Sequence, residues 1–179
     1  MKINMSHGSG GKASAELMKD IFGKYFSNEI LDKMEDAAVL DLHSRFACST
    51  DSFVVTPVVF PGGDIGKLAV CGTVNDLLMM GAVPKYITAG FILEEGLEID
   101  LLVQIAASMA KTAEEAGVRI IAGDTKVVEG KGGLYINTTG LGVIPEERNI
   151  SASNCGEGDV ILVSGNLGDH HACILSARM

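Results

Sequence analysis

The sequence contains no tryptophan, and aromatic residues make up only 5% of its 179 positions. It also lacks an excess of basic charge, because 14 Lys and Arg residues stand against 23 Asp and Glu residues, for a formal net charge of −9. Nucleic-acid binding depends on clustered Lys and Arg that neutralise phosphates. We therefore expect no nucleic-acid partner, whereas a nucleotide remains compatible with this charge if a divalent cation separates its phosphates from the carboxylates.

The cysteines form no CxxC pair: they are Cys48, Cys71, Cys155 and Cys173. This spacing disfavours a zinc site or the disulfide framework of a small secreted domain, and it predicts reduced thiols. No uncharged stretch reaches membrane-spanning length, and the first residues show no apolar signal segment. We expect a soluble, cytoplasmic protein with no membrane partner.

Hydrophobic residues make up 47% of the chain, and 22 residues are glycine, so the composition predicts a folded domain with many tight turns. Periodicity indicates an α/β (α+β) fold in the order β-β-α-β-α-β-β. The expected strands are 37–42, 45–55, 85–93, 118–122 and 134–143, and the expected helices are 64–80 and 99–116, with a glycine-rich segment leading into a further helical stretch over 13–25.

Strands 45–55, 85–93 and 118–122 could pair in parallel, and the hairpin-like last strand makes the predicted sheet mixed. Two helices cover only one face of this sheet. We therefore predict a homodimer formed through the sheet of residues 37–143, with Gly140 and Gly142 allowing close approach there.

Residues 1–150 are predicted to be one domain, followed by a polar linker over 151–157. Residues 159–164 look like a new strand and are followed by the beginning of a helix. A lone strand and part of a helix cannot bury themselves. We therefore interpret 151–179 as a linker and the beginning of a truncated second α/β domain.

Four aspartates stand where a Mg²⁺ ion could use them: Asp36, Asp51, Asp76 and Asp124. Asp124 directly follows the predicted strand 118–122, at the strand end where ligands bind in open α/β sheets. Asp76, beside Asn75, falls in an apolar helix stripe, and burying a carboxylate without a partner costs several kcal/mol or more, so it is the strongest single candidate. The alternative is that each aspartate is a cap or turn residue.

Gly10, Gly11 and Lys12 could present backbone N–H groups and a positive charge to phosphate oxygens, although the segment does not fit the spacing of a P-loop. It could equally be a disordered terminal segment. Lys126 is the better candidate for a phosphate or substrate contact, against the alternative of a solvated surface lysine.

Several runs together resemble the HypE-type hydrogenase expression/formation proteins of the aminoimidazole ribonucleotide synthetase-like superfamily. Elements shared with the wider superfamily are Asp36-Ala37-Ala38-Val39, Thr50-Asp51 and Asn75-Asp76. The hydrogenase branch is indicated by Gly63-Asp64-Ile65-Gly66-Lys67-Leu68-Ala69, Phe91-Ile92-Leu93-Glu94-Glu95-Gly96 and Gly123-Asp124-Thr125-Lys126-Val127-Val128. The resemblance covers nearly the whole chain.

The resemblance implies an N-terminal α/β domain that dimerises through its sheet, with ATP near the dimer interface and Mg²⁺ held by aspartates. It implies a carbamoyl dehydratase in hydrogenase maturation: a carbamoyltransferase partner loads a C-terminal cysteine, ATP phosphorylates the amide oxygen, and phosphate loss leaves a thiocyanate. This thiocyanate supplies cyanide to the iron of a [NiFe]-hydrogenase, through an iron-delivering maturation scaffold. We assign catalytic roles to Lys126 and Asp76, and nucleotide binding to the candidate residues named above.

Two other functions stay open. One is a different ATP-dependent superfamily member, such as a selenophosphate synthetase or a small-molecule kinase. A selenophosphate synthetase would be expected to carry a reactive cysteine near the glycine segment, and the first cysteine here is Cys48. The other is a dimerisation and docking module without activity of its own.

Overall fold

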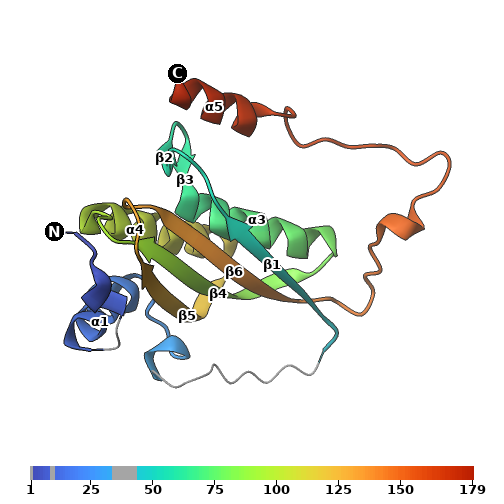
Figure 1. The fold of residues 1–179 in the computed structure, drawn as a ribbon. Helices are drawn as coiled ribbons and strands as arrows, with labels where there is room; N and C mark the ends of the chain where they lie inside the picture. The colour runs from blue at the N-terminus through green and yellow to red at the C-terminus, as the bar shows by residue number, and fades with distance from the viewer. Residues whose placement is uncertain (1, 9–10, 34–43) are drawn as a thin grey trace.

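A four-stranded mixed sheet forms the centre of the computed structural model, which describes residues 2–8, 11–33 and 44–179 (Figure 1). In spatial order the strands are β1 (Phe46–Phe53), β6 (Leu134–Val143), β4 (Val83–Glu94) and β5 (Arg119–Val128). β4 and β5 are parallel, and β6 is antiparallel to both of its neighbours. The predicted mixed sheet is confirmed, while the strand expected over 37–42 lies outside the described residues.

The predicted pairing of the strands was wrong in one respect. β6 is inserted between β1 and β4, so β1 runs in the same direction as β4 without pairing with it, and β6 does not form a hairpin with β5. Alternation of apolar residues determines which face of a strand is buried, but it does not identify the neighbouring strand. β5 is also longer than the apolar run 118–122 suggested, because it continues to Val128 as a polar edge strand.

Two long helices, α3 (Ile65–Met79) and α4 (Ile99–Ala116), pack on one face of the sheet (Figure 1). Asp64 caps the start of α3, because its side chain accepts a hydrogen bond from the Lys67 backbone N–H at 2.9 Å. Gly140 of β6 faces this helix, since a Cβ there would lie 2.5 Å from Cγ2 of Thr73. The close approach that Gly140 allows is therefore to α3 of the same chain, which corrects its predicted role in a dimer contact.

A third helical stretch covers the same face beside β5. It starts as α1 (Lys12–Leu17), passes through a π-helical turn η2 (Met18–Phe22) and ends as α2 (Gly23–Phe26). The ring of Phe22 lies 4.7 Å from that of Phe91 on β4. Short 3₁₀ turns precede and follow this stretch, η1 (Met5–Gly8) and η3 (Leu31–Lys33).

The remaining elements lie at the end of α3 that begins at Ile65. β2 (Val59–Phe60) and β3 (Gly63–Asp64) form a small hairpin, and α5 (Asp169–Arg178) lies beside it (Figure 1). The Arg178 side chain donates to the Thr56 carbonyl oxygen at 2.6 Å.

Between β6 and α5, the only regular element is the turn η4 (Ala152–Asn154). The strand predicted over 159–164 is not present: its apolar side chains are exposed, and none of the described strands lies beside it to supply hydrogen bonds. No helix in the described part of the chain is both long and apolar enough to span a bilayer.

Candidate functional site

Two of the predicted aspartates, Asp51 and Asp76, lie at the same junction between β1 and α3. β1 alternates, so that Ser49 and Asp51 point towards α3. The Ser49 hydroxyl donates to Oδ2 of Asp76 at 2.6 Å, and Oδ2 of Asp51 lies 3.7 Å from where a Cβ on Gly72 would be. Gly72 and Asp76 are four residues apart on the same side of α3, so both carboxylates belong to one small region.

The reason for choosing Asp76 was wrong, because its side chain is exposed rather than buried, as is that of Asn75. The buried stripe of α3 passes instead through Thr73, Val74 and Leu77. Residues 75 and 76 lie at the flank of the helix over β1, which is an edge strand and leaves this side open to solvent. An exposed carboxylate held by one hydroxyl keeps free lone pairs, which a metal ligand requires.

Asp124 and Lys126 lie elsewhere in the chain. Both are inside β5 and not beyond its end, and their exposed side chains form an ion pair at 3.4 Å. Asp124 is in register with Gly90, on the face that the helices leave uncovered, whereas Asp51 is in register with the buried Thr138 on the opposite face. β1 and β5 are also the two edges of the sheet, so one chain does not bring Asp124 and Lys126 to Asp51.

The glycine segment begins against β5. A Cβ on Gly8 would lie 2.9 Å from both N and Cβ of Val127, so only glycine allows this contact. Gly11 precedes the first turn of α1, and Lys12 forms an exposed ion pair with Glu16 at 3.6 Å. Gly10 and Asp36 lie outside the described residues. The segment therefore starts on the covered face at the β5 edge of the sheet, whereas Asp51 lies at the β1 edge and the Lys126 side chain points to the uncovered face.

Asp51 and Asp76 fit a Mg²⁺ ion better than they fit a zinc ion. No cluster of three or more His, Cys, Asp or Glu side chains able to hold a metal occurs among residues 2–8, 11–33 and 44–179. Mg²⁺ is commonly bound by one or two carboxylates, with phosphate oxygens and waters as its other ligands. The donor set at β1 and α3 therefore suits a cation that arrives with a phosphate.

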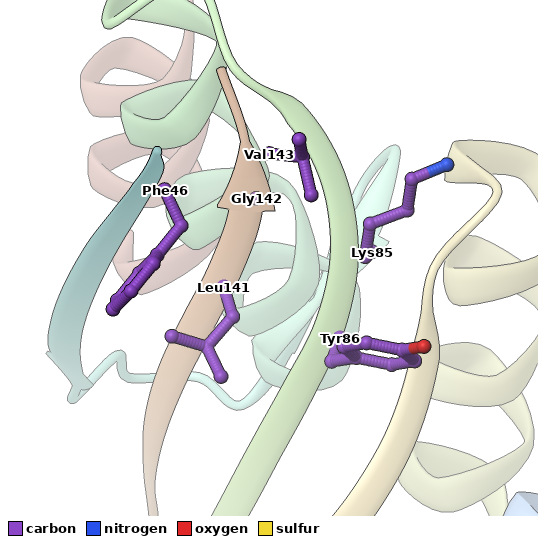
Figure 2. Close-up of a pocket in the computed structure, with 6 residues that line it drawn as sticks. All are labelled: Phe46, Lys85, Tyr86, Leu141, Gly142 and Val143. Atoms are coloured by element: carbon purple, nitrogen blue, oxygen red, sulfur yellow. The ribbon is translucent and has the colours of Figure 1, made fainter. Parts of the chain in front are cut away.

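A shallow hollow lies on the uncovered face, around the beginning of β4 and the end of β6 (Figure 2). The rings of Phe46 and Tyr86 and the side chain of Leu141 lie on its sides, with Lys85, Gly142 and Val143 completing its lining. Its lining contains no carboxylate, and its surface is apolar. This hollow is suited to another apolar surface and not to a triphosphate.

A hydrogen-bonded carboxylate that sequence reasoning missed lies at the other end of the uncovered face. Glu94 accepts hydrogen bonds from the backbone N–H groups of Lys131 and Gly133 at 2.8 and 2.9 Å, and from the Tyr135 hydroxyl at 3.0 Å. These bonds stabilise the ionised carboxylate and lower the pKa of Glu94, with the Lys131 N–H making the largest contribution. The same contact raises the pKa of Tyr135. Two features of the sequence could have indicated this contact: a glutamate at the end of a strand, and the separate glycine-rich run 130–133, whose backbone N–H groups can approach a carboxylate closely.

Residues 34–144 match the family described as AIR synthase related protein, N-terminal domain. The chain is 51% identical to the carbamoyl dehydratase HypE of Rhodobacter capsulatus, over 99% of this chain and 54% of the relative. It is 50% identical to HypE of Escherichia coli (strain K12), over 98% of this chain and 55% of that protein. The chain therefore spans about half the length of these curated relatives.

Solved structures show the same fold. A crystal structure of the hydrogenase maturation protein HypE in complex with ATP superposes with a TM-score of 0.94 at 53% identity, over 97% of this chain and 52% of that one. HypE in a HypE–HypF complex gives 0.73 at 52% identity, over 90% and 53% of the two chains.

Proposed function

Because the chain belongs to the family described as AIR synthase related protein, N-terminal domain, we propose a nucleotide-dependent function for it. Specifically, we propose that it is the ATP-binding half of a carbamoyl dehydratase of hydrogenase maturation. The observation that carries the proposal is that Asp51 and Asp76 lie at one junction between β1 and α3. A HypE with the same fold has been crystallised in complex with ATP, which supports a nucleotide as the ligand.

In this proposal Asp51 and Asp76 hold a Mg²⁺ ion against the phosphates, together with Asp36, which lies outside the described residues. The bound cation would neutralise phosphate charge. Ser49 orients the Asp76 carboxylate by donating to its Oδ2 at 2.6 Å, which leaves the second oxygen free for the cation. Lys126, Gly11 and Lys12 contribute positive charge and backbone N–H groups to the phosphates.

The proposed reaction removes the oxygen of a carbamoyl group, which requires that this oxygen first be activated. The oxygen of a carbamoyl group is a poor leaving group, and transfer of the ATP γ-phosphoryl group to that oxygen makes it a good one. Loss of inorganic phosphate, with the nitrogen giving up its protons, leaves a nitrile on the carrier sulfur, which is a thiocyanate. Enzymes catalyse phosphoryl transfer chiefly through positioning and charge neutralisation, which aspartates with Mg²⁺ and a lysine supply.

We propose that residues 151–179 are a linker and the beginning of a second α/β domain, and that the carrier cysteine belongs to the tail of the complete enzyme. The carbamoyl group would come from a carbamoyltransferase partner, and the solved HypE–HypF complex of a relative supports such a contact. The cyanide would pass to an iron-delivering maturation scaffold. A cytoplasmic location agrees with the four free cysteines.

We further propose a homodimer through the uncovered face of the sheet. Its hollow and the half-exposed side chains of Phe46 and Ile92 give a second copy an apolar surface to cover. A two-fold arrangement that brings β5 of one copy to β1 of the other would place the strand that carries Lys126 beside the strand that carries Asp51, with the two side chains on opposite faces of the sheets.

The test compares ATP binding and phosphate release by this chain and by a longer version that continues into a second α/β domain ending in cysteine. We expect Mg-dependent ATP binding by both, and release of phosphate upon carbamoylation only by the longer one. Substrate-dependent release by the short chain at the rate of the long one would contradict the tail-cysteine mechanism. Binding of a partner without any ATP binding would favour a docking module instead.

A further inference from the structure

The turn after β4, Glu94 to Glu98, joins three separate parts of the chain. The backbone N–H of Gly96 donates to the Ile3 carbonyl oxygen at 3.0 Å, and Ile3 N–H donates to Leu97 at 2.7 Å. This turn therefore holds the N-terminal segment that leads into the glycine-rich residues. It belongs to the run Phe91 to Gly96, to which the proposed function gives no role.

Glu95 makes two contacts that bridge the candidate phosphate-contacting segments. Its carboxylate Oε1 accepts a hydrogen bond from the backbone N–H of Met5 at 3.0 Å. Its own backbone N–H donates to the Val128 carbonyl oxygen at 2.9 Å. Met5 is three residues before Gly8, and Val128 is two residues after Lys126.

The two bridged segments also touch each other directly. η1 begins at Met5 and ends at Gly8, and Gly8 packs against N and Cβ of Val127, where no side chain would fit. Inside η1, the buried His7 holds the turn closed, because its Nδ1 accepts from the Asn4 backbone N–H at 3.1 Å. A shift of Met5 is therefore transmitted to Gly8 and to its contact with Val127, the residue next to Lys126.

We infer that Glu95 is a positioning residue for nucleotide binding: its carboxylate holds the N-terminal segment at a fixed distance from Lys126. The inference rests on the proposed function, since it assumes that these segments contact phosphates. Glu95 itself touches no substrate. Among the described residues, the bond from Met5 is the hydrogen bond that the Glu95 side chain makes. A variant that keeps an acceptor oxygen at position 95 should therefore bind ATP like the parent.

The experiment is an ATP titration in the presence of Mg²⁺, with the parent chain and three variants. In Glu95→Ala the acceptor for Met5 is lost, and we expect affinity to fall about fivefold, the size of one ordinary hydrogen bond. Glu95→Gln keeps an acceptor oxygen and should bind ATP like the parent. Glu98→Ala is the matched control, because it removes the same charge from the same turn and breaks only an exposed ion pair with Lys2.

Amide hydrogen exchange without nucleotide gives an independent readout. The Met5 amide should exchange faster in Glu95→Ala and at the parent rate in Glu95→Gln and Glu98→Ala. Parent-like affinity of Glu95→Ala, or failure of Glu95→Gln to restore affinity, would overturn the inference and leave the proposed function standing. Absence of Mg-ATP binding by the parent chain would overturn the proposed function, and the inference with it.

Discussion

The two faces of the sheet differ in what covers them. α3, α4 and the stretch from α1 to α2 bury one face, and its inward side chains, such as Ile87, Phe91 and Ile136, are almost fully hidden. The other face carries an apolar hollow near Leu141 at one end and the hydrogen-bonded Glu94 at the other, and none of the described helices lies over it (Figure 1). Both faces carry candidate site residues, but only the covered face carries the Asp51–Asp76 region.

We infer from this difference that the two faces serve different purposes. On the covered face, tight packing fixes α3 against β1, so Asp51 and Asp76 are held in place before any ligand binds. On the uncovered face, the exposed side chains of Asp124 and Lys126 form an ion pair with each other, and such a solvent-exposed pair contributes little to the stability of the fold. We therefore expect the covered face to supply the cation site and the uncovered face to supply the subunit contact.

The largest effect should come from breaking the uncovered face. Leu141→Glu puts a charge into the hollow between Phe46 and Tyr86 and should convert the proposed homodimer into a monomer, since an unpaired charge is costly to bury. Sedimentation at roughly tens of micromolar protein tests this. Leu78→Glu, at an exposed leucine on α3, is the control and should remain dimeric. A monomeric parent chain would contradict the proposed interface.

The next effect concerns the covered face. Asp76→Asn keeps the shape of the side chain but removes the charge that a hard cation needs, so Mg-ATP affinity should fall by about 10- to 100-fold. Thermal unfolding should remain near that of the parent, because Asp76 is exposed. Glu115→Gln, an exposed charge removal on α4, is the control. Unfolding of Asp76→Asn, or unchanged ATP binding, would make Asp76 a structural residue.

A smaller effect is expected at the loop that carries the chain from β5 across the end of β4 to β6. A Cβ on Gly133 would lie 2.7 Å from Cδ of Glu94, which cannot move without losing its three hydrogen bonds. Gly133→Ala should therefore lower the free energy of unfolding by about 1–3 kcal/mol, measured by urea denaturation. Gly156→Ala meets nothing within 4 Å and should not destabilise the chain. Equal stability of the two variants would contradict the crowding at Glu94.

The smallest effect is a pH dependence from Glu94. Its pKa is lowered below the usual 4.5 in the folded chain, so its ionised form contributes stability above that value, and this contribution is lost as pH falls through the folded pKa. Glu94→Gln removes the titration. The difference in unfolding free energy between the parent and Glu94→Gln should therefore shrink on acidification below 4.5. A difference that stays constant with pH would show that the hydrogen bonds do not depend on the charge.

The helices and most strands could be predicted from the sequence because their signals are local. Gly117, with a φ of 68°, ends α4 directly after the predicted range 99–116, and β6 matches the predicted strand 134–143, with every second residue buried. The position of β6 between β1 and β4 could not be predicted, since strand order depends on pairing between segments far apart in the sequence. The residues 159–164 have the composition of a strand, but a strand also needs a neighbour.

The candidate site was predicted only in part, for a similar reason. Asp51 and Asp76 were identified as residues, but their approach depends on how α3 crosses β1. The separation of Asp124 from them follows from sheet order and face, which no single segment encodes. Glu95 was overlooked because its contact with Met5 joins residues that are 90 positions apart.

The central claim is that this chain binds ATP through a cation held by Asp51 and Asp76, and calorimetric titration of ATP tests it most directly. The titration is run with Mg²⁺ and with a chelator, on the parent chain and on the double variant Asp51→Asn, Asp76→Asn. The account predicts saturable binding by the parent only with Mg²⁺, and none by a double variant that remains folded. Equal binding by the double variant, or Mg-independent binding by the parent, would contradict it.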